Sequence, residues 1–180
     1  MKRLISVFCI ALCGVVPAVA ADAPLIVDEQ VMEMASPGDW TGFYAGLGAM
    51  GIAFVEPPEA SMWAVDGIVG FNWQANDVIV VGAEAWLSGW RADDGETGVS
   101  GGTEIRAGFL VTPQLLTYAS LGGMHFFKED GATYAQFGVG AEYMVTEDIS
   151  VDLEYKHWQE VSGAGNYSAN AISASVLWHF

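Results

Sequence analysis

From residue 40 onward, apolar and polar residues alternate in short segments that are separated by turn residues. A period of two places successive side chains on opposite faces of an extended chain, so each segment predicts a β-strand with one apolar and one polar face. Eight such segments follow one another, and an all-β fold of eight strands is therefore expected. Their predicted ranges are 40–53, 62–73, 78–90, 102–111, 114–126, 133–145, 149–160 and 168–180.

The composition indicates whether the apolar faces contact lipid or pack inside a soluble protein. The chain is 52% hydrophobic, yet its formal net charge is −16, and it contains no apolar run of the roughly 20 residues that a membrane helix needs. A transmembrane β-barrel accommodates both properties, because its outer wall is apolar while alternate residues point into a polar interior. A soluble lipocalin-like barrel or β-sandwich is the competing fold and would bury the apolar faces instead.

Connections of two lengths alternate along the chain. Short turns are expected at 74–77, 112–113 and 146–148, and longer loops rich in Gly, Pro and Asp at 54–61, 92–101, 127–132 and 161–167. Outer-membrane barrels have short periplasmic turns and longer extracellular loops. The pattern predicts an eight-stranded antiparallel up-and-down transmembrane β-barrel whose longer loops lie outside the cell.

The first 20 residues have the order of a secretory signal peptide. Lys2 and Arg3 precede an apolar stretch at 4–16, and small residues lead up to Ala20, after which cleavage is expected. A membrane anchor is a weaker alternative because the apolar stretch is too short, and lipoprotein processing at Cys13 is another. Residues 21–39 predict an acidic periplasmic segment without strand pattern, and residues 40–180 predict the barrel.

Removal of this peptide would change both the thiol content and the charge. The two cysteines, Cys9 and Cys13, would be lost, which excludes disulfides and cysteine catalysis in the mature chain. Four basic residues would remain against 22 acidic ones, a formal charge of −18. A nucleic-acid partner is excluded on that basis.

Charged residues on the predicted inner face form a candidate lumen network. Burying a charge is costly unless it is paired, so we expect most of them to form ion pairs that fill the barrel. The alternative function is a narrow cation-preferring channel for small solutes, although eight strands leave little room beyond side chains. The predicted lumen residues are Asp66, Glu84, Glu104, Arg106, Glu142, Asp152, Glu154 and Lys156.

Aromatic residues near the strand ends predict girdles at the membrane–water interfaces. They are Trp40, Trp73, Trp90, Tyr143 and Trp178, which we expect on the outer face.

Catalysis and metal binding have weaker signals. His157 with Glu160 and either Ser162 or Ser168 is the candidate set for a lipid-modifying enzyme, but its spacing matches no catalytic pattern. The three histidines fall on separate predicted strands, so no metal site and no cofactor are expected. The acidic loop at 93–96 could attract Ca²⁺, although such loops are usually solvated.

The segment Trp40-Thr41-Gly42-Phe43-Tyr44-Ala45-Gly46 and the ending at 176–180 resemble the opacity-protein and OmpA-like outer-membrane β-barrels ("porin family") of Gram-negative bacteria. Residues 70–74 and 154–156 are similar to family patterns as well. The resemblance implies an outer-membrane location among lipids and lipopolysaccharide, and it implies that the barrel-assembly machinery reads Phe180. Members differ widely in activity. We expect a non-catalytic structural or surface-interaction role, with the extracellular ligand unidentified.

Overall fold

A computed structural model describes residues 39–55, 60–128, 131–163, 165 and 167–180. The predicted signal peptide and all but the last residue of the predicted acidic segment lie outside the described residues. Within the described part, no helix is long and apolar enough to cross a membrane. The predicted all-β class and the number of strands are confirmed. The strands are β1 (Gly42–Phe54), β2 (Ser61–Gln74), β3 (Ile79–Ala92), β4 (Thr97–Thr112), β5 (Leu115–Phe126), β6 (Thr133–Met144), β7 (Ile149–Ser162) and β8 (Ser168–His179).

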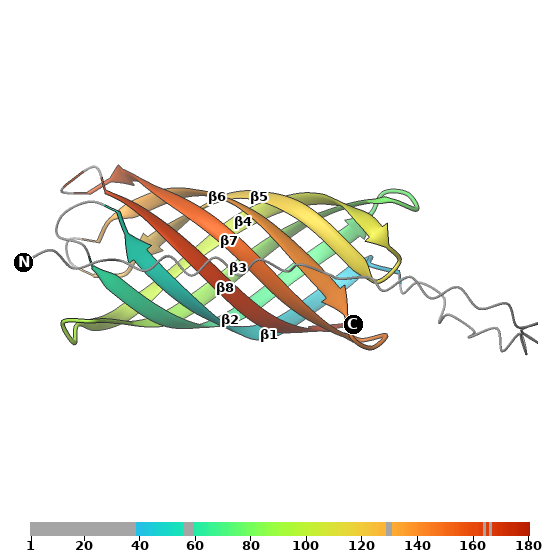
Figure 1. Cartoon of the computed structure of the whole chain (residues 1–180), viewed down its shortest axis with the longest axis horizontal. Coiled ribbons are helices and arrows are strands. Elements are labelled where there is room, and N and C mark those ends of the chain that lie inside the picture. The colour runs from blue at the N-terminus through green and yellow to red at the C-terminus, as the bar shows by residue number, and fades with distance from the viewer. Residues whose placement is uncertain (1–38, 56–59, 129–130, 164, 166) are drawn as a thin grey trace, which may run out of the picture. The chain divides into compact units, whose positions relative to one another are not determined.

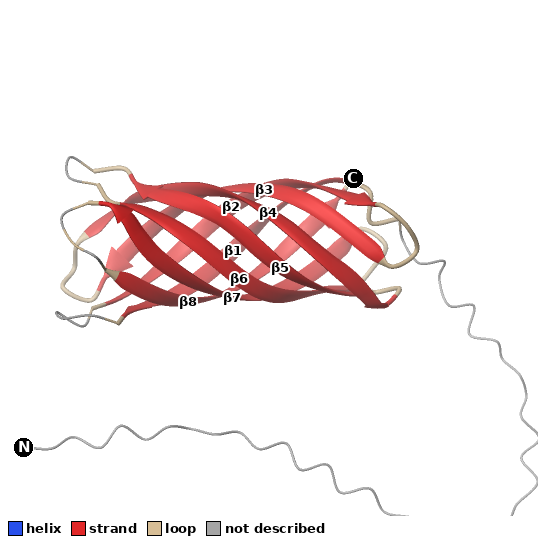
Figure 2. Cartoon of the chain, turned by 90° about the horizontal axis from the view of Figure 1, so that it is seen from above, coloured by secondary structure: helices blue, strands red, loops and turns tan. Residues whose placement is uncertain are grey.

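The strands form one closed barrel in sequence order. Each strand pairs antiparallel with the next, and β8 pairs with β1, where Ala49 lies opposite Ala174. The strands run obliquely around the barrel (Figures 1 and 2). Closure leaves no open sheet edge, so the backbone groups of every strand find partners on both sides. The connections after β1, β3, β5 and β7 lie at one end, the loop end, and the others lie at the turn end.

The apolar face of each strand lies outside and the polar face lies inside. In β7, Leu153 is 59% exposed, whereas its neighbour Glu154 is 3% exposed. The same alternation holds in β8, where Val176 faces out and Ser175 faces in. This is the reverse of a soluble barrel, in which the apolar face would be buried.

One predicted boundary is wrong. The expected loop at 92–101 is shorter, because β4 begins at Thr97, which pairs with Arg91. The turn needs only residues 93–96, where Gly95 has a φ of +94° that favours glycine. Residues 97–101 include two glycines and a serine, so they show little alternation of apolar and polar side chains. The missing side chain of Gly98 leaves the space that the Trp90 ring occupies. The other strand ends lie within two residues of their predicted positions.

Candidate functional site

The structure places all eight predicted lumen residues inside the barrel. Seven of them are buried, and Glu84 is half-buried. The eight residues come from β2, β3, β4, β6 and β7, so the network crosses the lumen rather than following one strand pair. Six carboxylates and two basic groups share this space, and the two basic groups organise it.

Arg106 is the centre of the first group, which we call the Arg106 group. Its Nη2 lies 2.9 Å from Glu142 Oε2, and its Nε donates to Asn72 Oδ1 at 3.1 Å. Glu142 Oε1 also accepts a hydrogen bond from Ser150 Oγ at 2.6 Å and lies 3.0 Å from His179 Nε2. The carboxylate is therefore surrounded by four strands, β4, β6, β7 and β8, in a fully buried site.

Two tyrosine rings flank the Arg106 guanidinium. The ring centres of Tyr44 and Tyr118 lie 4.8 Å and 5.2 Å from Arg106 Cζ, within the range of cation–π attraction. Their hydroxyls donate to two further lumen carboxylates, Glu84 Oε2 at 2.9 Å and Asp152 Oδ2 at 2.8 Å. The tyrosines thus link the Arg106 group to two carboxylates that form no ion pair with a basic side chain of the described residues.

Lys156 is the centre of the second group, the Lys156 group. Its Nζ lies 2.7 Å from Glu104 Oε2 and 3.0 Å from Glu154 Oε2, and 4.5 Å from the centre of the Trp86 ring. Gln136 Nε2 donates to the same Glu104 oxygen at 2.8 Å. One ammonium therefore forms ion pairs with two buried carboxylates, on β4 and β7, which are not neighbouring strands in the barrel.

Little space is left between these groups. Asp66, Glu84 and Lys156 help to line an internal cavity of about 10 Å³, which is close to the smallest cavity that holds one water molecule. This cavity is too small to hold a hydrated ion.

An aromatic layer covers the loop end of the charged interior. Trp90 meets Phe126 edge-on at 5.5 Å, Phe126 meets Tyr134 at 5.8 Å, and Tyr134 contacts Trp158 at 6.2 Å. All four side chains are at most 6% exposed. Such edge-to-face contacts are favourable geometries for aromatic pairs, so this layer closes the loop end.

A second apolar layer covers the turn end. Trp40 packs with Val80, Leu116 and Met144 and is 1% exposed. Its indole Nε1 donates to the Pro113 carbonyl oxygen at 3.1 Å. The charged interior therefore lies between two apolar layers.

The expected outer-face orientation is wrong for Trp40 and Trp90, because both side chains point inward. Trp90 lies six residues after Glu84, an even separation that puts both on the same face of β3. Trp40 likewise lies four residues before the inward Tyr44. The inward orientation of Trp90 was therefore predictable from the sequence. If the charged Glu84 side chain points inward, alternation along the strand makes Trp90 point inward as well.

Three predicted interfacial aromatics do lie on the outer wall. Trp73, Tyr143 and Trp178 are 56%, 51% and 59% exposed. Phe180 is 76% exposed, and its backbone N–H donates to the Phe43 carbonyl oxygen at 2.9 Å. Their location at the membrane–water interfaces stays a prediction, and so does the recognition of Phe180 by the barrel-assembly machinery.

A concave site at the loop end was not predicted from the sequence. It is a cavity of about 270 Å³ above the aromatic layer, which we call the loop-end cup. Four aromatic residues from four strands, a fifth from the connection before β8, three carboxylates and one lysine meet there. They are Phe54, Trp90, Phe126, Tyr134, Tyr167, Asp94, Glu96, Glu160 and Lys128.

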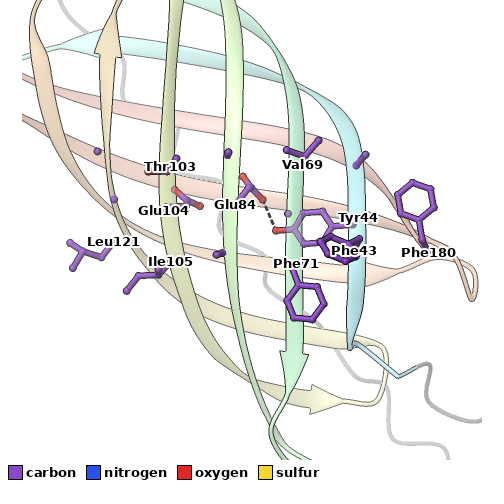
Figure 3. A pocket seen from close by; sticks show the side chains of 16 residues that line it. Phe43, Tyr44, Val69, Phe71, Glu84, Thr103, Glu104, Ile105, Leu121 and Phe180 are labelled. Carbon is purple, nitrogen blue, oxygen red and sulfur yellow. Dashed lines mark hydrogen bonds between the residues drawn. The ribbon is translucent and has the colours of Figure 1, made fainter.

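A further concave region lies on the outer wall. This groove of about 710 Å³ crosses β1 to β5, with Phe43, Phe71, Ile105 and Leu121 projecting around it (Figure 3). The groove is deepest where small residues of neighbouring strands lie opposite one another. Ala85 pairs with Thr103, and Thr103 pairs with Gly123.

The candidate catalytic set does not come together. His157 and Glu160 lie on opposite faces of β7, because their separation is odd. His157 Nδ1 lies 2.9 Å from Asn170 Oδ1, while the Glu160 carboxylate accepts backbone N–H groups of the following loop. In the described residues, no cluster of three or more metal-ligating side chains is placed to hold an ion.

Solved structures of several bacterial proteins share the fold of this chain. Neisserial surface protein A is 17% identical with a TM-score of 0.50, over 78% of this chain and 98% of that one. The N-terminal barrel domain of Pseudomonas aeruginosa OprF is 18% identical with a TM-score of 0.51, over 76% and 97%. Ail, the attachment invasion locus protein of Yersinia pestis, is 13% identical with a TM-score of 0.52, over 78% and 99%.

A comparison with curated protein sequences finds no significant match. The family of outer membrane protein β-barrel domains matches residues 10–180, nearly the whole chain. This family indicates an outer-membrane location, in agreement with the apolar outer wall and the polar interior. The chain belongs to the outer membrane protein β-barrel domain family.

Proposed function

We propose that the protein is a non-catalytic outer-membrane barrel with a closed interior and a structural or surface-interaction role in the cell envelope. The observation that carries this proposal is the filled lumen. Two buried basic groups, Arg106 and Lys156, hold the carboxylates of β4, β6 and β7 together between two apolar layers. A pore would need a continuous wet path, and the residual cavity of about 10 Å³ argues against one.

The proposed orientation places the loop end outside the cell and the turn end in the periplasm. It follows the general arrangement of outer-membrane barrels, in which the turns on the periplasmic side are short. The described connection between β4 and β5 has only two residues, 113 and 114, and lies at the turn end. Export through a signal peptide cleaved after Ala20 and assembly by the barrel-assembly machinery belong to the same proposal.

Outer-membrane lipids and lipopolysaccharide are the proposed partners of the outer wall. Hydrocarbon would contact the exposed apolar rows, and acyl chains would fill the groove beside Ile105 and Leu121. The favourable term is the burial of apolar surface. The groove needs no enzymatic role to explain it.

Single-channel recording in planar bilayers tests the closed interior. Purified protein that runs as a folded barrel, with a mobility that changes on boiling, is inserted at known protein-to-lipid ratio. We expect no steady, ion-selective current. Reproducible conductance steps would replace the structural role with the narrow cation-preferring channel that six lumen carboxylates would favour.

Mass spectrometry of lipid A tests the non-catalytic part of the proposal. Lipid A from cells with and without the protein should have the same acyl composition. A shift in acyl chain number that is lost in the His157→Ala variant would instead support a lipid-modifying enzyme. Mass spectrometry of the mature protein should give the mass of a chain that begins at Ala21.

A further inference from the structure

We propose that the loop-end cup binds a small organic cation, an alkylammonium or quaternary ammonium group that approaches from outside the cell. This inference rests on the proposed function in one respect, since that function places the loop end at the cell surface. The closed aromatic layer beneath the cup makes it a pocket with a floor instead of the entrance of a channel.

The floor and sides of the cup are aromatic. Trp90, Phe126 and Tyr134 form the buried floor, and Phe54 and Tyr167 also line the cavity. Aromatic faces carry a negative quadrupole that attracts cations, and Trp is the most favourable ring for this purpose. The methyl or alkyl groups of such a cation would also bury apolar surface against these rings.

The charges that line the cup select against anions. Asp94, Glu96 and Glu160 contribute three carboxylates, and among the described residues lining the cup Lys128 is the basic one. Glu160 is 6% exposed, and its carboxylate is fixed at the wall because it accepts the backbone N–H groups of Gly165 at 3.3 Å and Tyr167 at 3.0 Å.

The chain's own lysine already occupies the position that a cation would take. Lys128 Nζ lies 5.8 Å from the centre of the Trp90 ring and 3.2 Å from Glu96 Oε1. These contacts join a cation to an aromatic face and a carboxylate at the same time. The Lys128 side chain is 48% exposed, so it can move into solvent when another cation replaces it. Lys128 therefore acts as an internal competitor for the site.

The floor of the cup also contains a buried hydrogen-bond donor. The Trp90 side chain is 5% exposed, and its indole Nε1 has no hydrogen-bond partner among the described residues. An unsatisfied buried donor costs free energy. Choline combines a quaternary ammonium group with a hydroxyl group, and it is therefore the probe for this class of ligand.

The test is a titration of the folded full-length mature protein with choline, by calorimetry at constant ionic strength. We expect saturable binding that is several-fold tighter in Lys128→Gln and several-fold weaker in Glu96→Gln. Trp90→Phe should weaken binding as well, since Phe is the poorer cation–π ring. Glu147→Gln is the matched control, because it removes one exposed carboxylate in the turn between β6 and β7, at the opposite end of the barrel.

Two results would overturn the proposal. The first is an absence of saturable choline binding in both the wild type and Lys128→Gln. The second is equal weakening by Glu96→Gln and Glu147→Gln with no effect of Trp90→Phe, which would indicate diffuse electrostatic attraction. Bilayer conductance of the same preparation separates this failure from failure of the closed interior, because an ion current does not depend on occupancy of the cup.

Discussion

Arg106 and Glu142 form an ion pair at 2.9 Å in the centre of the barrel, with side chains that are 2% and 0% exposed. They belong to β4 and β6, which are not neighbours in the sheet. The pair therefore reaches across the lumen and fixes the spacing of strands that share no backbone hydrogen bonds.

Replacing Arg106 with Met should destabilise the barrel strongly. The change leaves Glu142 buried without its main cation, which typically costs about 3–5 kcal/mol. Urea titration of the protein in detergent micelles or bilayers measures the free energy of unfolding. The double variant R106M/E142M should regain most of the loss, because it removes the unpaired charge. A single variant as stable as the wild type would contradict the role assigned to this pair.

Gly70→Ala should disrupt the contact between Tyr44 and Glu84. A Cβ at Gly70 would overlap Tyr44 Cζ, so the ring has to move away from its position. Overpacking of this kind costs about 1–3 kcal/mol. The matched control is Gly67→Ala in the same strand, where the nearest atom to the new Cβ is 4.0 Å away. Equal stability of the two variants in a urea titration would be evidence against the tight fit of Tyr44.

Adjacent labels on β8 should report opposite environments. A spin label at Val176→Cys projects from the outer wall, whereas one at Ser175→Cys starts from an inward position that is 7% exposed. In lipid bilayers, we expect oxygen, which concentrates in hydrocarbon, to relax the first label much more than the second. Val139→Cys, with Val139 59% exposed, repeats the outward case on β6. Shielding of both outward labels from acyl chains would contradict a lipid-facing wall.

The tryptophans should divide into two classes in brominated lipid. Trp73 is 56% exposed on the outer wall, while Trp40 is 1% exposed inside the turn end. Trp73→Phe should therefore lower the fraction of fluorescence that brominated acyl chains quench, and Trp40→Phe should raise it. The opposite pattern would mean that Trp40 faces the lipid, as its place near a strand end had suggested.

Much of the fold could be predicted from the alternation of apolar and polar residues along the chain. The eight segments and the side of each strand that carries charge follow from residues such as Glu154 and Leu153, because neighbouring side chains in a strand must point in opposite directions. Where the prediction failed, at Trp90, it departed from that rule by treating an aromatic residue near a strand end as outward. At Thr97 it failed because small residues carry almost no hydropathy signal.

The sequence by itself therefore determined the class of fold, the strand number and the inward set of charges, since alternation is a local property. It did not determine that Arg106 meets Glu142, that Lys156 is shared by Glu104 and Glu154, or that Lys128 lies over Trp90. Those contacts join strands and loops that are distant along the chain. Only closure of the barrel sets the register and curvature that bring them together.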